Sequence, residues 1–596
     1  MPTSQPLATA APDDLARVEA LMAAGRLGEA EAACRALLAE DPTRARALMR
    51  LGEIGARKGA WEPAIALFVR ALGRDPGLLE AYRHLGHALA QRRRFAEARR
   101  VYAALIERAP EDGEAHSNLG AMYGSLGDYE AACRALRRAV ELRPGFAPAH
   151  NNLGVALARV GRHGEAIEAY RRAIVLAPDY RDARCNLVFA MDLDPDTTAE
   201  AQRAARLDWG ERLIERHVAL RRPHANPPDP ERRLRVGYLS PDFRRHAAGT
   251  VALPLFLRHD RDAVEVHGYF NDPRADEVTE RFAVAAEGFR AVAGWSDERL
   301  AQQIRADGID ILVDLAGHSL GGRLELLAIK PAPLQFSGFG YGAGSTGLRT
   351  VDGFFAGPVQ AEGLRLDGAV EEVIELPAPF AIEPPEGAPP VTPLPLLARG
   401  QPTFGSFNRL SKVCGRTLDL WAAALAAVPA ARFLVKAGEL DSPGERERLT
   451  AALAGRGVAP GRLELRGASG RAEHLAAIAE ADLLLDTTPQ SGSATTAEAL
   501  WMGVPTLTPL GARPGGRASA SLLHCVGLEE FVVADPDGFG TRAAALLAGP
   551  GRLARLREGL RDRLRRSPIV EARPLVAALE AAYRERWRRW CAGAAA

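Results

Sequence analysis

The chain has 596 residues, of which 47% are hydrophobic and 25% are charged, so it is large enough for several ordinary globular domains. The 76 Lys and Arg residues nearly balance the 75 Asp and Glu residues, which excludes a protein dedicated to nucleic-acid binding, because such a protein needs a basic face. No apolar stretch approaches the roughly 18 residues of a membrane helix, and no secretory signal is seen, so we expect a cytoplasmic protein with no membrane partner. The six cysteines are scattered and form no CxxC pair, which favours neither a disulfide framework nor a metal site.

Residues 9–195 carry an internal repeat with a period of 34 residues. Prolines recur at this period because they end one unit and start the next, and alanines and glycines recur because small side chains let paired helices pack closely. The positions are Pro42, Pro76, Pro110, Pro144 and Pro178; Ala30, Ala64, Ala98, Ala132 and Ala166; and Gly52, Gly86, Gly120 and Gly154. This period is typical of tetratricopeptide repeats and predicts about five helix pairs over residues 9–178, with one weaker helix beyond them.

A second set of glycines marks the turn inside each helix pair. These are Gly25, Gly59, Gly127 and Gly161, and Arg93 replaces the glycine in one repeat. Stacked repeats form a groove that usually binds an extended peptide or a partner protein, and Asn118 and Asn152 occupy equivalent positions suited to a peptide backbone. We therefore expect the array to recruit a protein or peptide. A purely architectural or dimerising arm is the alternative, and the sequence allows a homo-oligomer.

Residues 196–232 connect this array to the rest of the chain through a polar helix over 196–221 and a proline-rich segment. From residue 233 short apolar runs alternate with helical stretches, which predicts parallel sheets covered by helices on both faces. Strands are expected at 234–240, 264–270, 310–316 and 334–340, and then at 404–408, 432–438, 463–467, 483–487 and 506–511. We predict two Rossmann-like domains, 233–395 and 396–564, then a helix over 565–596, with ligands at the carboxyl ends of the strands between the domains.

Two motifs in the first of these domains suggest other functions. Gly342, Gly344 and Gly347 match a dinucleotide fingerprint, but no amphipathic helix follows and no acidic residue appears about 20 positions later, so NAD binding is not expected. Gly317–Gly321 resembles the nucleophile elbow of an α/β-hydrolase with Ser319 at its centre. Its acid and histidine would be Asp486 and His524, which belong to the other predicted sheet; the hydrolase is kept as an alternative.

Polar residues follow two predicted strands of the second domain. Segment 406–412 delivers Asn408, Arg409 and Lys412, and a lysine there can neutralise a departing diphosphate, although a surface lysine is the simpler explanation. Segment 483–503 ends a strand with a small, hydroxyl-rich loop and then opens a helix, whose N–H groups and partial positive charge suit a phosphate. Its residues of interest are Ser491, Gly492, Thr495, Thr496 and Glu498, the last placed to accept hydrogen bonds from a ribose. The alternative is a plain capping segment with Thr495 or Thr496 as the N-cap.

Six stretches carry a resemblance that covers residues 1–590 almost throughout: 234–246, 307–323, 330–348, 404–413, 471–489 and 495–511. They resemble the O-linked N-acetylglucosamine transferase and SPINDLY family. The resemblance implies an α plus α/β multidomain protein, with a tetratricopeptide-repeat superhelix followed by a GT-B fold of two Rossmann-like domains. It also implies an inverting, metal-independent glycosyltransferase without a cofactor, which moves a sugar from a nucleotide-sugar donor to Ser or Thr of a protein. It argues against the elbow, because the family has a GHT or GHS turn there without a serine nucleophile.

The resemblance also implies roles for individual residues. Lys412 contacts the donor diphosphate and assists its departure, and His246 faces the acceptor. Asp242 and His318 line the same cleft mouth. The remaining donor-binding residues are Asn408, Arg409, Arg471, His474, Ser491, Gly492, Thr495, Thr496, Glu498 and Arg517, of which Arg471 and His474 flank the base. The general base stays open between His246 and a phosphate oxygen of the donor.

Three departures from the family pattern leave the sugar open. Loop 491–494 lacks a histidine found in animal enzymes, Arg409 replaces a common glutamine or asparagine, and segment 340–347 contains an added residue. The donor is therefore open among UDP-N-acetylglucosamine, GDP-fucose and other nucleotide sugars. A repeat scaffold whose transferase module has lost activity is the remaining alternative.

Overall fold

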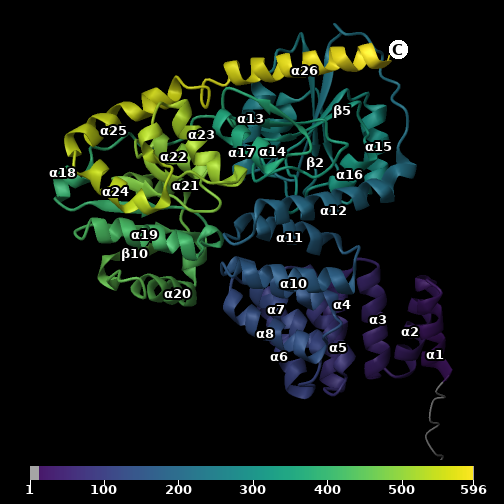
Figure 1. Cartoon of the computed structure of the whole chain (residues 1–596). Helices are drawn as coiled ribbons and strands as arrows, with labels where there is room; N and C mark the ends of the chain where they lie inside the picture. Colours follow the sequence, from purple (N-terminus) through teal and green to yellow (C-terminus); the bar gives the residue numbers. More distant parts are fainter. Residues whose placement is uncertain (1–12, 595–596) are drawn as a thin grey trace, which may run out of the picture. The chain divides into compact units, whose positions relative to one another are not determined.

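The computed structural model describes residues 13–594, so residues 9–12 of the predicted array and 595–596 of the predicted final helix lie outside it (Figure 1). The chain forms two compact units. The repeat unit extends up to Val160 and includes Glu168–Tyr180, and the two-sheet unit contains Gly161–Ile167 and everything from Arg181 onward.

The predicted helix pairs are confirmed. The helices are α1 (Asp13–Ala23), α2 (Leu27–Glu40), α3 (Ala45–Arg57), α4 (Trp61–Arg74), α5 (Leu79–Gln91), α6 (Phe95–Arg108), α7 (Gly113–Ser125), α8 (Tyr129–Leu142), α9 (Ala147–Arg159), α10 (His163–Leu176) and the single following helix α11 (Arg181–Leu193). The glycines permit the close packing within a pair: a Cβ added to Gly86 would lie 2.5 Å from the ring of Tyr102. Gly52, Gly120 and Gly154 are equally tight against Phe68, Leu136 and Tyr170.

The turn glycines have left-handed backbones, with φ between 73° and 82° at Gly25, Gly59, Gly127 and Gly161. Arg93, which replaces the glycine in one repeat, adopts the same region with φ of 57°. A side chain is disfavoured there because its Cβ crowds the backbone. The repeat therefore imposes its turn geometry even on a residue that does not prefer it.

The connector helix is α12 (Ala199–His217), followed by the short η1 (Val218–Leu220), so it is shorter than the predicted 196–221. It is also not polar on all sides. Gln202, Arg206, Trp209 and Leu213 are buried on one face of the helix. This face explains why a polar composition still gives a packed helix.

The first sheet is parallel throughout, with strand order β3-β2-β1-β4-β5-β6-β7. Its strands are β1 (Leu234–Ser240), β2 (Val264–Phe270), β3 (Gly288–Ala291), β4 (Ile311–Asp314), β5 (Leu334–Gly338), β6 (Gly353–Ala356) and β7 (Glu372–Glu375). Its helices are α13 (Ala247–Arg258), α14 (Glu277–Ala285), α15 (Asp297–Ala306), α16 (Leu324–Ile329) and α17 (Pro358–Asp367). The predicted β1 and β2 are confirmed to the residue, whereas β3, β6 and β7 were not predicted. Strands β3 and β7 are the two edge strands and expose most of their side chains, so they carry no apolar run. Strand β4 ends at Asp314 rather than at 316, since that carboxylate turns the chain by accepting from the N–H of Gly317 at 2.7 Å.

The second sheet is also parallel, with the order β10-β9-β8-β11-β12-β13 of a Rossmann fold. Its strands are β8 (Thr403–Ser406), β9 (Arg432–Lys436), β10 (Leu463–Arg466), β11 (Leu483–Leu485), β12 (Thr506–Pro509) and β13 (Val532–Val533). Its helical elements are α18 (Pro395–Arg399), η2 (Leu410–Lys412), α19 (Gly415–Ala427), η3 (Gly438–Asp441), α20 (Pro443–Ala454), η4 (Pro460–Arg462), α21 (Arg471–Ala479), α22 (Ala494–Trp501), η5 (Pro514–Arg517), α23 (Ala518–Cys525), η6 (Glu529–Phe531), η7 (Pro536–Gly538), α24 (Phe539–Leu547) and α25 (Pro550–Arg565). The predicted pair of parallel sheets is confirmed, with β13 as a missed two-residue edge strand.

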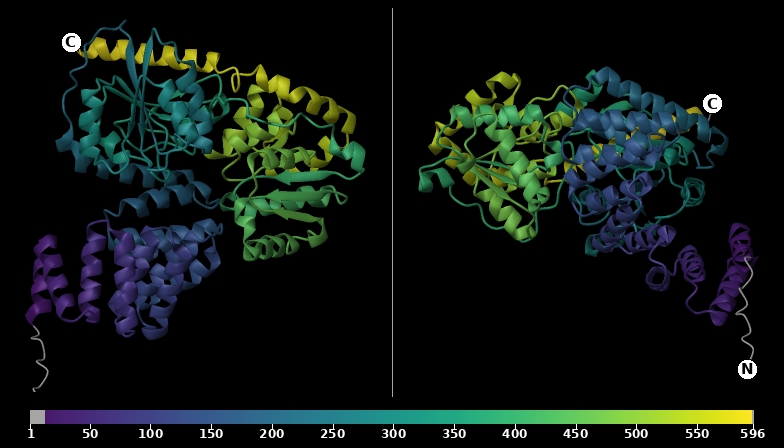
Figure 2. Two further views of the ribbon diagram at one scale, coloured as in Figure 1. Left: turned by 180° about the vertical axis from the view of Figure 1, so that it is seen from behind. Right: turned by 90° about the horizontal axis from the view of Figure 1, so that it is seen from below.

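The last helix, α26 (Arg573–Ala594), begins later than the predicted residue 565, because α25 extends to Arg565. It returns to the first sheet, and it can be followed in Figure 2 as the long yellow helix beside the strands of that domain. The Tyr583 hydroxyl lies 3.1 Å from that of Tyr238 on β1, and Glu580 accepts a hydrogen bond from His259 at 2.7 Å. The helix thus completes the core of a domain that precedes it by a long stretch of chain.

In each sheet the order of the strands along the chain reverses at one point. This point lies between β1 and β4 in the first sheet and between β8 and β11 in the second. Doubly wound proteins bind their ligands at the carboxyl ends of the strands on either side of such a reversal. Across residues 13–594 every helix is too short or too polar to span a bilayer.

Candidate functional site

His246 follows β1 at the reversal point of the first sheet and is the N-cap of α13. Its Nδ1 accepts a hydrogen bond from the Ala248 N–H at 3.2 Å and lies 3.3 Å from Asp242 Oδ1. Burial lowers the pKa of His246, with Arg244 and Arg409 acting in the same direction and Asp242 against them. Burial also raises the pKa of Asp242. The ring is therefore neutral near pH 7 and its Nδ1 is used as an acceptor.

His318 follows β4 and is 2% exposed. Burial, together with nearby Arg206, lowers its pKa to about 3, so the ring is neutral and Nε2–H donates to the Thr346 carbonyl at 2.9 Å. Within the described residues its Nδ1 is buried without a hydrogen-bond partner. The predicted residues Asp242, His246 and His318 therefore follow the carboxyl ends of β1 and β4. Because these two strands are parallel neighbours, their carboxyl ends lie at the same edge of the sheet.

The hydrolase alternative is wrong. Ser319 Oγ donates to the Ala316 carbonyl at 2.6 Å, and His524 pairs with Glu529 at 3.0 Å. Asp486 lies in the second sheet, where it binds Asn408. These three side chains have separate partners and form no triad.

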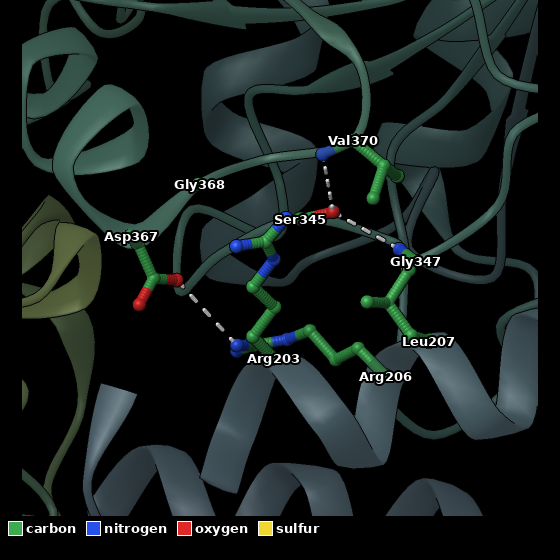
Figure 3. A pocket seen from close by; sticks show the side chains of 8 residues that line it. All are labelled: Arg203, Arg206, Leu207, Ser345, Gly347, Asp367, Gly368 and Val370. Atoms are coloured by element: carbon green, nitrogen blue, oxygen red, sulfur yellow. Dashed lines mark hydrogen bonds and ion pairs between the residues drawn. The ribbon is translucent and has the colours of Figure 1, made fainter. Parts of the chain in front are cut away.

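The glycine-rich segment 342–347 is a packing loop. A Cβ on Gly344 would lie 2.6 Å from the guanidinium of Arg206, and Gly347 sits against the backbone of the same residue. Figure 3 shows Arg206 beneath this loop, with Ser345 bonded to the N–H groups of Gly347 and Val370. Asp367 lies 3.7 Å from the guanidinium of Arg206. The strand β6 follows the loop, in agreement with the expectation that no dinucleotide helix is present. The glycines make room for a buried arginine.

Lys412 lies at the end of η2, just after β8. Its Nζ donates to the Ser491 carbonyl at 2.7 Å. Burial, assisted by Arg409 and opposed by Asp486, lowers the pKa of the amine to about 8. The predicted convergence of this amine on the loop before α22 is therefore found.

Asp486 organises that loop. Its Oδ1 accepts from Asn408 Nδ2 at 3.1 Å and from the N–H groups of Thr487 and Gly492 at 2.8 Å, and its Oδ2 accepts from Thr508 at 2.8 Å. Four donors hold one buried carboxylate, so the ends of β8, β11 and β12 are fixed relative to one another. The sequence assigned Asp486 only to the hydrolase alternative; its place directly after a buried strand was the signal for its real position.

Helix α22 begins at Ala494, and its N-cap Ser493 makes no side-chain cap within the described chain. Thr495 and Thr496 lie inside the first turn, so the prediction that one of them is the N-cap is wrong. Thr496 Oγ1 bonds Ser519 Oγ at 2.8 Å, and Ser491 Oγ accepts from the Ser519 N–H at 3.2 Å. The N-terminal N–H groups of a helix without a side-chain cap can bind an anion.

Arg471 and His474, on α21, lie beside Glu498 of α22. Arg471 donates to Glu498 at 2.5 Å, and His474 Nε2 lies 3.4 Å from the second carboxylate oxygen. Burial opposes ionisation of Glu498, but the hydrogen bonds from His474 and Arg471 lower its pKa. His474 also meets the edge of Phe407, with ring centroids 5.7 Å apart. The three predicted residues are thus brought together, with the carboxylate already engaged.

The remaining predicted residues have distinct surroundings. Arg409 is exposed, and its charge is near enough to lower the pKa of both His246 and Lys412. Arg517 is buried and donates to the Gly511 carbonyl at 2.8 Å and to Glu362 at 2.6 Å. It therefore joins the two Rossmann-like domains. No group of three or more His, Cys, Asp or Glu side chains suited to a metal ion occurs in residues 13–594.

Comparisons with known proteins agree with this architecture. Residues 197–358 and 397–579 match Glycosyl transferase family 41, and residues 15–78, 84–145 and 123–181 match tetratricopeptide repeats. The solved structure of a mutant of the Thermobaculum terrenum O-GlcNAc transferase is similar over 87% of this chain and 99% of its own, with 38% identity and a TM-score of 0.80.

Two plant proteins are also similar. Both are named probable UDP-N-acetylglucosamine–peptide N-acetylglucosaminyltransferase SPINDLY. The Petunia hybrida protein is 34% identical over 65% of this chain and 42% of its own length. The Arabidopsis thaliana protein is 34% identical over 65% of this chain and 43% of its own. The chain thus spans less than half the length of these relatives.

Proposed function

We propose that this chain, which belongs to glycosyltransferase family 41, transfers a sugar from a nucleotide-sugar donor to a serine or threonine hydroxyl of a protein. The observation that carries the proposal is the Lys412 amine, 2.7 Å from the Ser491 carbonyl, beside the N-terminus of α22. A cation and a helix N-terminus at one point suit a diphosphate. The names of the similar proteins support the same activity.

The reaction needs one bond made and one broken. The acceptor hydroxyl attacks the anomeric carbon from the face opposite the leaving group, so the configuration inverts. The bond between that carbon and the phosphate oxygen breaks, and its electron pair stays on the diphosphate. Lys412 and the N–H groups of α22 stabilise this developing charge, which is the kind of interaction that gives large rate effects. Because these groups supply the positive charge, we propose that neither a metal ion nor a cofactor is required.

The hydrogen bonding of His246 bears on the proton transfer. Nδ1 faces both the Ala248 N–H and Asp242 Oδ1; we assign it as the acceptor of the Ala248 N–H, which places the hydrogen of the neutral ring on Nε2. In that tautomer the ring offers a hydrogen bond to the site and has no free lone pair for the hydroxyl proton. We therefore assign the base role to a phosphate oxygen of the donor, and to His246 the role of orienting the acceptor or the sugar.

The repeat unit is proposed to recruit the acceptor protein through its groove, as tetratricopeptide arrays do for extended peptides. We further propose that the protein acts in the cytoplasm. The alternative of a scaffold that has lost activity has no support in the site, since Lys412, Asp486 and the start of α22 are assembled there.

A panel of nucleotides tests the proposal. A ligand that binds only the folded state raises stability by RT ln(1 + [L]/Kd), so the preferred donor gives the largest thermal shift. UDP and UDP-N-acetylglucosamine are expected to shift the transition most, with GDP and GDP-fucose as the competing pair. Release of the nucleotide in the presence of Ser- and Thr-containing peptides then measures turnover. A chain that binds none of the four compounds is the outcome that contradicts the proposal.

A further inference from the structure

Residues 161–167, which are the end of the turn before α10 and the first residues of α10, lie in the same compact unit as the two sheets. Gly161 approaches the backbone of Val413 so closely that a Cβ added to it would lie 2.8 Å from the Val413 carbonyl oxygen. Its φ of 77° is also one that glycine adopts without strain. The turn therefore reaches the segment after β8, directly beside Lys412.

His163, the first residue of α10, makes the specific contact of this segment. Its ring is 2% exposed, and Nε2 lies 2.9 Å from the carbonyl oxygen of Ser411. A carbonyl only accepts, so Nε2 carries the hydrogen and donates it. Burial lowers the pKa of His163, which keeps the ring neutral. Ser411 is the residue immediately before Lys412.

The segment that carries Lys412 is held at three places. Asn408 binds Asp486 on its N-terminal side, and on its C-terminal side Cys414 and Thr417 donate to the Thr488 carbonyl at 2.9 and 2.7 Å. Those two anchors belong to the second Rossmann-like domain itself. The third anchor, on the turn between them, comes from His163. An amine that must meet a diphosphate needs its supporting backbone fixed to about half an ångström.

We propose that His163 is a positioning residue for Lys412, which holds the Ser411 carbonyl and thereby fixes the place of the amine in the donor site. The inference rests on the proposed function. His163 does not touch the donor; it acts through the Ser411–Lys412 backbone. Its removal should therefore reduce the rate of the chemical step more than the affinity for the nucleotide.

The test uses three substitutions in the full chain. His163→Phe keeps the ring packing and removes the donor, and His163→Asn moves the amide away from the Nε2 position. Both are expected to lower kcat for nucleotide release from UDP-N-acetylglucosamine about tenfold or more, with the KM for that donor changed less than threefold. His163→Gln, whose amide reaches the Nε2 position, is expected to restore kcat to within threefold. Arg162→Ala, which removes only an exposed pair with Glu165, is the matched control.

A double-mutant cycle separates positioning from general destabilisation. In a Lys412→Ala background, His163→Phe should change the single-turnover rate less than twofold, because its effect passes through the missing amine. A folded His163→Phe with kcat within twofold of the parent overturns the inference, as does a full additional loss in the Lys412→Ala background. Failure of both the Phe and Asn variants to fold also overturns it, since His163 would then serve the fold alone. Absence of turnover in the parent with UDP-N-acetylglucosamine and with GDP-fucose instead removes the proposed function, and this inference with it.

Discussion

The repeat unit and the two-sheet unit reach a stable structure by different means. In the repeat unit each contact is local and recurs, so Gly52, Gly86, Gly120 and Gly154 all meet the second helix of their own pair. In the two-sheet unit single buried polar groups join distant parts of the chain, such as Asp486 with Asn408 or Glu580 with His259. A substitution in the first kind of structure has a graded effect on stability, whereas one in the second can remove a function without changing the fold.

The largest effect is expected from Lys412→Ala. Loss of the amine removes charge stabilisation of the departing diphosphate, and comparable losses elsewhere cost about 2.7–4 kcal/mol, or a factor of 10²–10³ in kcat. Steady-state nucleotide release measures this, with circular dichroism as the check on folding. A variant with unchanged turnover contradicts the role of Lys412.

In the repeat unit, Gly86→Ala is expected to lower the free energy of unfolding by about 1–3 kcal/mol, because the new methyl group overlaps the ring of Tyr102. Gly124→Ala is the control: it lies in α7 with no atom within 4 Å of an added Cβ, and alanine favours a helix. Chemical denaturation measures both. Equal stabilities would show that the close approach at Gly86 is not required.

The role of His246 is tested by His246→Gln and His246→Ala. If the ring donates from Nε2, the glutamine amide should keep kcat within about threefold, and alanine should lose about tenfold, the value of one hydrogen bond. A general base would instead contribute about 10²–10⁴ in rate, and glutamine could not replace it. A loss of that size in both variants assigns the base to His246 and contradicts the tautomer derived from the Ala248 contact.

The pKa of Lys412, lowered to about 8, predicts a pH dependence. The protonated amine binds the diphosphate, so the affinity for UDP should be constant below about pH 8 and fall above it, by up to tenfold per pH unit. The free protein should become more stable as the pH rises from about 8 towards the ordinary lysine value, since the unfolded chain then binds the additional proton. Calorimetric titration with UDP measures the first effect. Lys412→Arg, which stays charged, should abolish the fall in UDP affinity above about pH 8.

The smallest effect is expected from Arg93→Gly. It removes the strain of a side chain at φ of 57° but increases the conformational freedom of the unfolded chain. The free energy of unfolding is expected to rise by about 0.5–1 kcal/mol. Gly59→Ala, at the same place in another repeat, should destabilise instead. Thermal unfolding compares the two, and a destabilised Arg93→Gly would show that the contact of Arg93 with Phe95 outweighs the strain.

These differences explain what the sequence predicts. The helix pairs and the turn at Arg93 can be predicted because the same pattern of Pro, Ala and Gly recurs every 34 residues. Strands β1 and β4 are recognised because their residues are almost all buried and mostly apolar, but the edge strands β3 and β7 expose most of their side chains and β13 has only two residues. Lys412 and Ser491 were predicted as site residues because both follow strands. Their contact, the use of Asp486 as a common acceptor and the role of Arg517 at the domain junction depend on side chains that meet only in three dimensions.

Helix α26 has a consequence for how the molecule is made. Its Tyr583 packs against Phe336 and Phe355 of the first sheet, with ring centroids 5.9 and 5.7 Å apart. These aromatic partners leave the ribosome long before α26 does. During synthesis the side chains of Phe336 and Phe355 therefore lack the ring of Tyr583 that packs against them in the folded protein. The first Rossmann-like domain can complete its core only after the second domain and α26 have been synthesised. The order of translation and the order of assembly therefore differ in this chain.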